Sequence, residues 1–228
     1  MTRFSLAGVL CVFVGLSALV AACSIRPIEP NAEYNSVVVV QDFFTSFFVL
    51  ETDSRVVLFD AGFRTSRVEQ GLADLGFLPS DVTDIFVSHG HSDHVAALSL
   101  LDQADTFGLA AEADLLEAES GLRPTSLLSD GDLVQVDQFT VEVFAVPGHT
   151  AGNAVYLVDG VLLLGDSAIV TRDGTLDSTP ARYSDDPSQL DSQLRELADE
   201  LGAREDEIDW VVGSHSGGVN DASPLFAF

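Results

Sequence analysis

The chain has 228 residues, 46% of them hydrophobic, which is enough for one medium-sized α/β domain, or at most two small ones, with a real core, and argues against disorder. Thirty-six acidic residues against ten basic ones give a formal net charge of −26, and all ten bases are arginine. Such a field repels polyanions, which argues against nucleic acid as a partner, and it opposes anionic substrates unless salt screens it.

The charge has two explanations that the sequence leaves open. A halophilic source accounts for both the acid excess and the missing lysine, and so does a GC-rich genome that encodes an ordinary acidic surface. Neither explanation indicates a function.

The N-terminus has the pattern of a targeting segment. Arg3 precedes an apolar run from Leu6 to Ala22, and this run is short for a transmembrane helix, so residues 1–22 are predicted to be a secretory signal peptide. The stretch LVAAC resembles a bacterial lipoprotein signal, in which Cys23 becomes the lipidated first residue of the mature protein. An ordinary cleaved signal or an uncleaved anchor is the alternative. We therefore expect a cell-envelope protein that is held at the membrane through Cys23 or secreted to the periplasm.

Two domain boundaries follow from composition. Residues 23–33 contain two prolines and few apolar residues, so we predict a lipid-attached tether there and a single folded domain over residues 34–228. The chain has two cysteines, Cys11 and Cys23, and both precede that domain. The domain is therefore expected to contain no disulfide and no thiolate metal ligand.

The rest of the chain alternates strand and helix signals, with neither a repeat nor a long linker. Strands come first, then mix with helices, and then return, an order that predicts an α/β fold of two packed sheets with helices outside. The elements expected are three strands within 36–62, a helix 68–77, a strand 84–88, a helix 94–103, a strand and helix within 108–120, hairpins over 132–149 and 154–166 (the second turning at Asp159-Gly160), a helix 186–201 and a last strand within 208–217. Asp185 or Asp186 is expected to cap the helix 186–201, with Pro187 in its first turn.

Four phenylalanines within the first strands have two interpretations. Phe43, Phe44, Phe47 and Phe48 are expected to alternate between the core and the sheet face, and a binding stripe is the alternative.

The stretch VSHGHSDHVAAL, from Val87 to Leu98, carries the chemistry. His89 and His91 are two residues apart after a predicted buried strand, so an extended backbone presents both to one side. Asp93 and His94 follow at the start of the next predicted helix. Asp93 could merely cap that helix, but this leaves three neighbouring histidines unexplained. The pattern predicts a metal site.

The remaining donors also lie at predicted strand ends. His149 (PGHT), Asp166 (LLLGDS) and His215 (GSHSG) each follow a strand, where loops gather at one edge of a sheet and carry function. Taken singly, each has a plain structural explanation. Taken together, they account for all five histidines of the chain by one site. Imidazole and carboxylate ligands suit zinc, manganese or iron.

These motifs resemble the metallo-β-lactamase-fold hydrolase superfamily. VVLFDAGF, SHGHSDH, PGHTAG, LLGDS and GSHSG occur in the family's order over roughly 34–218. The resemblance implies a four-layer αββα sandwich with two divalent ions, commonly zinc. It implies that His89, His91 and His149 hold one ion, that Asp93, His94 and His215 hold the second, and that Asp166 bridges them. It also implies that Asp60, in LFDAG, orients the ligand loop, with a simple turn aspartate as the alternative.

The resemblance implies an enzyme acting on a small molecule, but not one reaction. Asp166 argues against a true β-lactamase and favours glyoxalase II-like thioesterases or lactonases. The expected reaction is attack of a metal-bridging hydroxide on an ester-like carbonyl, lactone or thioester, with Asp93 or Asp166 accepting the proton. The lack of lysine argues against glutathione thioesters. Tyr183 could donate to a substrate oxyanion or simply pack in a loop.

Two further interpretations stay open. The first is a mononuclear iron dioxygenase of persulfide sulfur, which would use His89, His149 and Asp166. The second is a metal-dependent binding protein at the cell surface without turnover. Neither the substrate nor the oligomeric state follows from these motifs.

Overall fold

The structure is a computed structural model that describes residues 24–228. The predicted signal peptide and Cys23 lie outside the described residues, so the lipid anchor stays a prediction. Within residues 24–228, no helix combines the length and apolar character that a membrane span requires. The segment predicted to be a tether contacts the domain: Arg26 N–H donates to Val170 O (3.0 Å), and Gly217 N–H donates to Arg26 O (3.0 Å).

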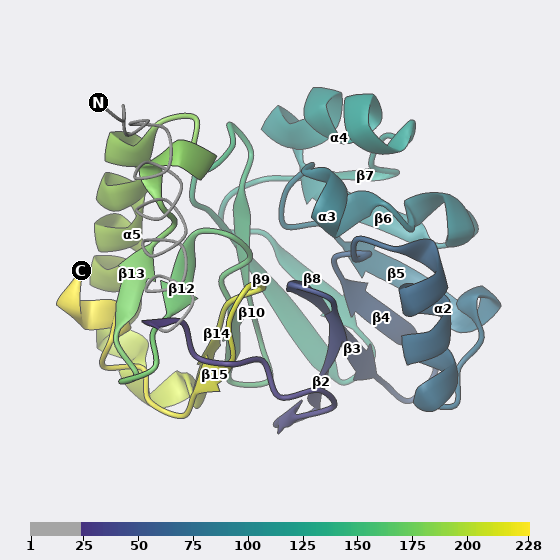
Figure 1. The fold of residues 1–228 in the computed structure, drawn as a ribbon, viewed down its shortest axis with the longest axis horizontal. Coiled ribbons are helices and arrows are strands. Elements are labelled where there is room, and N and C mark those ends of the chain that lie inside the picture. The colour runs from purple at the N-terminus through teal and green to yellow at the C-terminus, as the bar shows by residue number, and fades with distance from the viewer. Residues whose placement is uncertain (1–23) are drawn as a thin grey trace, which may run out of the picture.

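Two sheets face each other at the centre of the molecule (Figure 1). The first has the order β1-β2-β3-β4-β5-β6-β7 and the second the order β15-β14-β11-β10-β9-β8, while β12 and β13 form a separate pair. The strands of the first sheet are β1 (Glu33–Tyr34), β2 (Val37–Asp42), β3 (Thr45–Glu51), β4 (Val56–Phe59), β5 (Val82–Phe86), β6 (Asp105–Leu109) and β7 (Ser126–Leu128). The others are β8 (Leu133–Val136), β9 (Phe139–Ala145), β10 (Ala154–Val158), β11 (Val161–Leu163), β12 (Ala168–Val170), β13 (Leu176–Ser178), β14 (Trp210–Val212) and β15 (Gly218–Val219).

Helices cover the outer face of each sheet. The helices α2 (Thr65–Asp74), α3 (Ser92–Val95) and α4 (Ala113–Ser120) lie on the first sheet, and α5 (Pro187–Leu201) lies on the second (Figure 1). One buried cluster, which includes Phe48, Phe86 and Tyr156, fills the space between the sheets, and two others fill the spaces beneath the helices. The predicted four-layer αββα sandwich is therefore confirmed.

Local sequence signals placed several elements correctly. Asp159 and Gly160 have φ of 48° and 73°, and they close the hairpin in which Val158 pairs with Val161. Positive φ at both central residues is typical of the type I′ turns that join twisted strands. Helix α5 begins after Asp186, whose side chain accepts a hydrogen bond from Gln189 N–H (3.0 Å).

The predicted helix over 94–103 was wrong in length. Helix α3 ends at Val95, and a separate 3-10 turn covers Leu98–Leu100. The backbone N–H of Ala96 donates to Gly62 O (3.1 Å) and that of Ala97 to Ala61 O (3.2 Å). These long-range bonds direct the chain onto the loop after β4, so a continuous helix does not form.

The expectation for the four phenylalanines was half wrong. Phe47 and Phe48 are buried in the core, as expected. Phe43 and Phe44, however, form the two-residue turn between β2 and β3, in which Asp42 pairs with Thr45, and they are 65% and 45% exposed. A turn at this place interrupts the alternation of a strand, so both rings project from the sheet.

Candidate metal centre

Strand direction brings the predicted ligands to one edge of each sheet. In the first sheet β4, β5 and β6 are parallel, and His89 and His91 follow the carboxyl end of β5. In the second sheet β9, β11 and β14 run in the same direction, since β10 is antiparallel to β9 and β11, and β11 is parallel to β14. His149, Asp166 and His215 follow these three strands. Ligands at the carboxyl ends of strands are common in such sheets.

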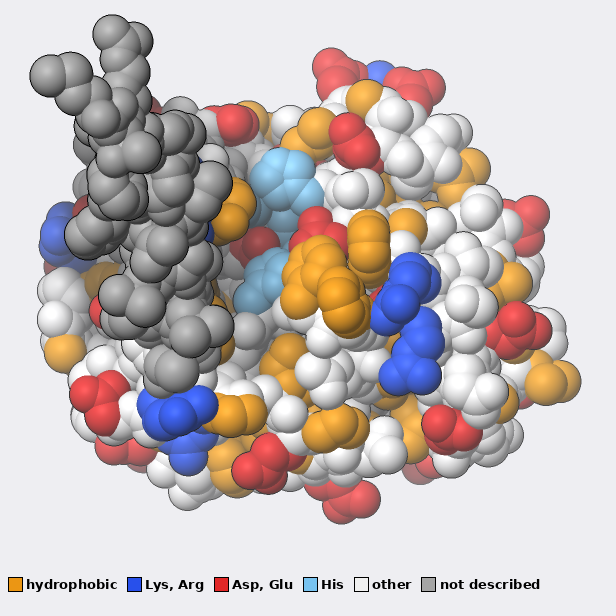
Figure 2. All heavy atoms as spheres, in the orientation of Figure 1, with side chains coloured by type: hydrophobic (Ala, Val, Ile, Leu, Met, Phe, Trp, Pro, Cys, Tyr) orange, Lys and Arg blue, Asp and Glu red, His pale blue; other side chains and the backbone are white. Residues whose placement is uncertain are grey.

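Two hydrogen bonds join the ligand-bearing ends of the sheets. Tyr156 Oη, on β10, donates to Val87 O (2.6 Å), and Ala154 N–H donates to Ser88 O (2.8 Å). Both acceptors precede His89. The second sheet therefore holds the end of β5 in place, and the loops of the two sheets face each other across a hollow in which histidine side chains are visible (Figure 2).

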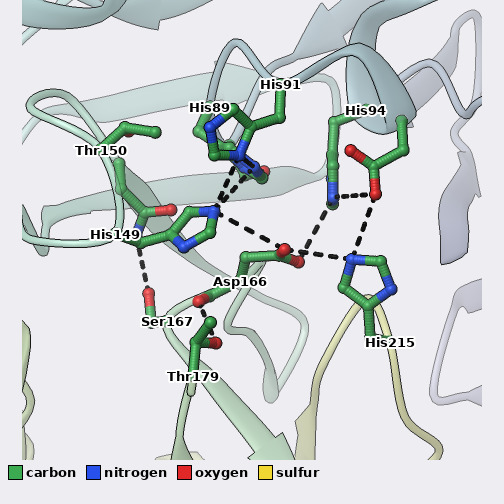
Figure 3. Close-up of polar contacts among 12 residues, drawn as sticks. His89, His91, His94, His149, Thr150, Asp166, Ser167, Thr179 and His215 are labelled. Atoms are coloured by element: carbon green, nitrogen blue, oxygen red, sulfur yellow. Dashed lines mark hydrogen bonds and ion pairs between the residues drawn. The ribbon is translucent and has the colours of Figure 1, made fainter. Parts of the chain in front are cut away.

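The first group of donors is three imidazoles, which we call the first triad: His89, His91 and His149. His89 Nε2 lies 3.1 Å from His91 Nδ1 and 3.2 Å from His149 Nε2, and His91 Nδ1 lies 3.0 Å from His149 Nε2. Three nitrogen atoms thus converge on one point (Figure 3).

The second triad consists of Asp93, His94 and His215. Asp93 Oδ2 lies 3.3 Å from His215 Nε2 and 3.7 Å from His94 Nε2. His94 is completely buried, whereas the side chains of Asp93 and His215 are 21% and 23% exposed. This triad therefore has an open side toward the hollow.

Asp166 lies between the two triads. Its Oδ1 is 3.3 Å from His94 Nε2, and its Oδ2 is 3.0 Å from His215 Nε2 and 3.6 Å from His149 Nε2 (Figure 3). Both oxygens thus face imidazole nitrogens, and the backbone carbonyl of Asp166 accepts a hydrogen bond from Thr179 Oγ1. The structure brings all seven predicted ligands together at one place.

Neighbouring groups determine which nitrogen of three histidines is free. Ser88 Oγ donates to Asp60 Oδ2 (2.8 Å), so it accepts from His89 Nδ1–H (3.0 Å). His94 Nδ1–H donates to Asp60 Oδ2 (2.8 Å), and His215 Nδ1–H donates to Phe44 O (2.9 Å). In the neutral form of each of these imidazoles, Nε2 is therefore the nitrogen that presents a lone pair to the site.

The donor set fits divalent cations. A tetrahedral ion that binds nitrogen at about 2.0–2.1 Å separates its ligands by about 3.3 Å, close to the spacing within the first triad. His94 Nε2 and Asp166 Oδ1 are buried without a hydrogen-bond partner. Unpartnered polar atoms of this kind call for a bound group, because burying them alone is costly. Imidazole with carboxylate suits zinc, manganese or iron.

The two triads differ in protonation. Burial lowers the pKa of His149 to about 4 and that of His89 well below its usual range. Burial also opposes the charging of His215 and His94, but the nearby carboxylates outweigh it: Asp166 and Asp93 raise the pKa of His215 to about 10, and Asp166 and Asp60 raise that of His94 well above its usual range. At neutral pH His89 and His149 therefore have free lone pairs, whereas an ion must displace protons from His94 and His215.

Three aromatic rings form the mouth of the site beside His215. The ring of Phe44 stacks on the His215 imidazole, with centroids 5.6 Å apart, and contacts Phe43 and Phe63 at 5.4 and 5.3 Å. The Arg64 guanidinium lies over the Phe43 ring and pairs with Asp42. Tyr183 is 57% exposed, and its ring contacts Arg182.

Asp60 has the orienting role that the family resemblance implied. It follows β4 at φ of 63°, a left-handed conformation that is uncommon for a residue with a side chain. Its Oδ1 accepts from Ser88 N–H (2.7 Å), and its Oδ2 accepts from Ser88 Oγ and His94 Nδ1. Sequence reasoning missed Ser88, the Phe44 carbonyl and Glu112. Glu112 shares one signal with the ligands, since it follows the carboxyl end of a parallel strand, β6.

The sequence profile of the metallo-beta-lactamase superfamily matches residues 40–215, a span that contains all seven donors. The chain belongs to this superfamily. Among relatives, the hydroxyacylglutathione hydrolase of Pseudomonas fluorescens is 30% identical over 117 residues, which cover 51% of this chain and 42% of that protein. That of Salmonella paratyphi B is 30% identical over 170 residues, covering 72% and 59%. The chain thus spans less than two thirds of the length of either relative.

Solved structures of superfamily members share the fold. A B3 metallo-beta-lactamase with an active-site glutamic acid superposes with a TM-score of 0.65 at 15% identity, covering 92% of this chain and 89% of that one. A metallo-beta-lactamase family protein from Thermus thermophilus gives 0.65 at 21% identity, covering 86% and 80%. At these identities the likeness concerns the fold alone.

Proposed function

We propose that this member of the superfamily is a dinuclear metal-dependent hydrolase of an ester-like carbonyl, a thioester or a lactone. One observation carries the proposal: two three-donor groups face the same hollow, and Asp166 lies between them, with Oδ2 near His215 of the second triad (3.0 Å) and His149 of the first (3.6 Å). A structural cluster of histidines would not need a carboxylate shared in this way.

The two triads, Asp166 and Asp93 would have different roles in this reaction. The first triad would hold one divalent ion and the second triad the other, and the ions would supply a nucleophilic hydroxide at neutral pH and polarise the carbonyl. Both oxygens of Asp166 are engaged with imidazoles, so this carboxylate serves mainly to hold the site. Asp93 is partly exposed to the hollow and can accept the proton released during attack.

Two observations support an acyl compound with an apolar part as the substrate. The relatives at 30% identity are named hydroxyacylglutathione hydrolases, and glutathione esters of that kind are thioesters. At the mouth, however, three phenylalanine rings contact one another, and the arginine over the Phe43 ring is already paired with Asp42. This surface and the net charge of −26 favour a neutral or apolar acyl group over a highly anionic one.

The iron dioxygenase alternative is less well supported. It uses His89, His149 and Asp166 and leaves the second triad without a role. Elemental analysis separates the two: about two metals per chain with no oxygen uptake supports hydrolysis, and about one iron with oxygen uptake on a persulfide supports the dioxygenase.

A substrate panel tests the proposal. Full-length protein loaded with zinc or manganese is expected to cleave at least one class in a panel of acyl thioesters and lactones of increasing chain length. His91→Ala removes one of three first-triad ligands and should lower kcat/KM by about 100-fold or more. A variant with undiminished rate, while still folded by circular dichroism, would refute the assignment.

A further inference from the structure

A second buried carboxylate, besides Asp60, hydrogen-bonds to the loops that carry the predicted ligands. Glu112 lies at the N-terminus of α4 and is only 2% exposed. Its Oε1 accepts from Gly90 N–H (2.7 Å), and its Oε2 accepts from Gly152 N–H (2.8 Å) and Thr150 Oγ1 (2.9 Å). One side chain thus joins the loop that carries His89 and His91 to the loop that carries His149.

The backbone of both loops closely approaches α4. A Cβ atom at Gly90 would lie 2.8 Å from Leu116 N, and one at Gly152 would lie 2.4 Å from Glu112 N. Any side chain at these positions would therefore push its loop away from the helix. The glycines allow the loops to reach the Glu112 carboxylate, and the carboxylate then determines the spacing between them.

No cationic side chain of residues 24–228 neutralises the charge of Glu112. No arginine forms an ion pair with it in the part of the chain that the structure describes. Burying a carboxylate is costly unless hydrogen bonds or a nearby positive charge compensate, and here only two backbone amides and one hydroxyl do so. A bound cation in the first triad would add that compensation, and this links the ion to Glu112 as well as to its ligands.

We propose that Glu112 is a positioning residue specific to the first triad, whereas Asp60 acts mainly on the second. Asp60 contacts His94 directly and reaches His89 through Ser88, whereas Glu112 contacts only the loops of His89, His91 and His149. The inference rests on the proposed dinuclear site. Removing the Glu112 carboxylate should lower the affinity of the first triad for its ion and leave the affinity of the second triad unchanged.

Zinc titration of full-length protein labelled with 15N at histidine tests this inference directly. All five histidines of the chain belong to the site, so imidazole correlation spectra report each triad separately. In Glu112→Gln, the amide nitrogen cannot accept from Gly152 N–H or Thr150 Oγ1. The zinc affinity measured from the His149 resonances should fall about 10–100-fold. The zinc affinity measured from the His215 resonances should change less than about threefold.

A milder variant and a matched control complete the experiment. Thr150→Val removes one of the three donors and keeps the shape of the side chain, so it should weaken the same affinity by about threefold to tenfold even if Glu112→Gln does not fold. Glu117→Gln, on the same helix but half exposed, should change neither affinity. Equal losses at both triads, or none in either test variant, would overturn the inference. Absence of zinc binding to the unaltered protein would instead overturn the proposed function.

Discussion

Asp60→Asn isolates the electronic role of Asp60 from its backbone conformation. Asparagine tolerates the left-handed φ of 63° nearly as well as aspartate, so the substitution adds little strain. The amide oxygen can still accept from Ser88 N–H. The amide nitrogen, in the place of Oδ2, cannot accept from His94 Nδ1–H or Ser88 Oγ, which both lie 2.8 Å away. We expect His94 to shift its proton to Nε2 and lose its lone pair toward the second triad.

The expected loss of zinc affinity follows from the hydrogen bonds that the substitution removes. A hydrogen bond to a charged group contributes about 1.5–3 kcal/mol, which corresponds to about 10–100-fold in the affinity of the second triad for zinc. Ser88 links the same carboxylate to His89, so the first triad should weaken by a smaller factor. Ser88→Ala breaks this link alone and should affect only the first triad.

Competition with a chromophoric zinc chelator measures both affinities. Asp159→Asn is the matched control, because Asp159 is also an aspartate at positive φ, in the hairpin turn between β10 and β11. It should leave both affinities unchanged. If Asp60→Asn kept both affinities within about threefold of the original protein, the argument that Asp60 sets the tautomer of His94 would be wrong.

Three further outcomes are expected. Since the pKa is about 4 for His149 but about 10 for His215, raising the pH from 6 to 9 should strengthen zinc binding at the second triad by about tenfold or more per pH unit and strengthen it less at the first. Equal pH dependence of the two zinc affinities in calorimetry would contradict this. Chelation should lower the melting temperature by about 10 °C, since each ion held at about 100 times its Kd contributes about 2.7 kcal/mol, and a melting curve insensitive to chelator would argue against tight binding. Phe43→Ser should raise KM for long acyl substrates about threefold to tenfold at constant kcat, whereas Leu133→Ser, equally exposed on β8, should not.

Much of the fold could be predicted because its signals are local. Runs of apolar residues predicted β2 and β3, the pair Asp159-Gly160 predicted a hairpin turn, and an aspartate before Pro187 predicted the start of α5. Such signals depend on the geometry of a few neighbouring residues. They failed where a distant segment intervened, as at Ala97, whose amide bonds to Ala61 O in the loop after β4 instead of continuing a helix.

The chemistry of the site could be predicted from the order of residues alone: the type and order of seven donors, and their position after strands. Which donors meet depends on the tertiary structure. His89 and His149 lie 60 residues apart, and their contact depends on the direction of β5 and β9 in two different sheets. The same applies to Glu112, whose three donors come from two separate loops, and to Phe44, whose carbonyl accepts from His215, 171 residues away. A local pattern specifies which groups are present, but strand order and direction determine the distances between them.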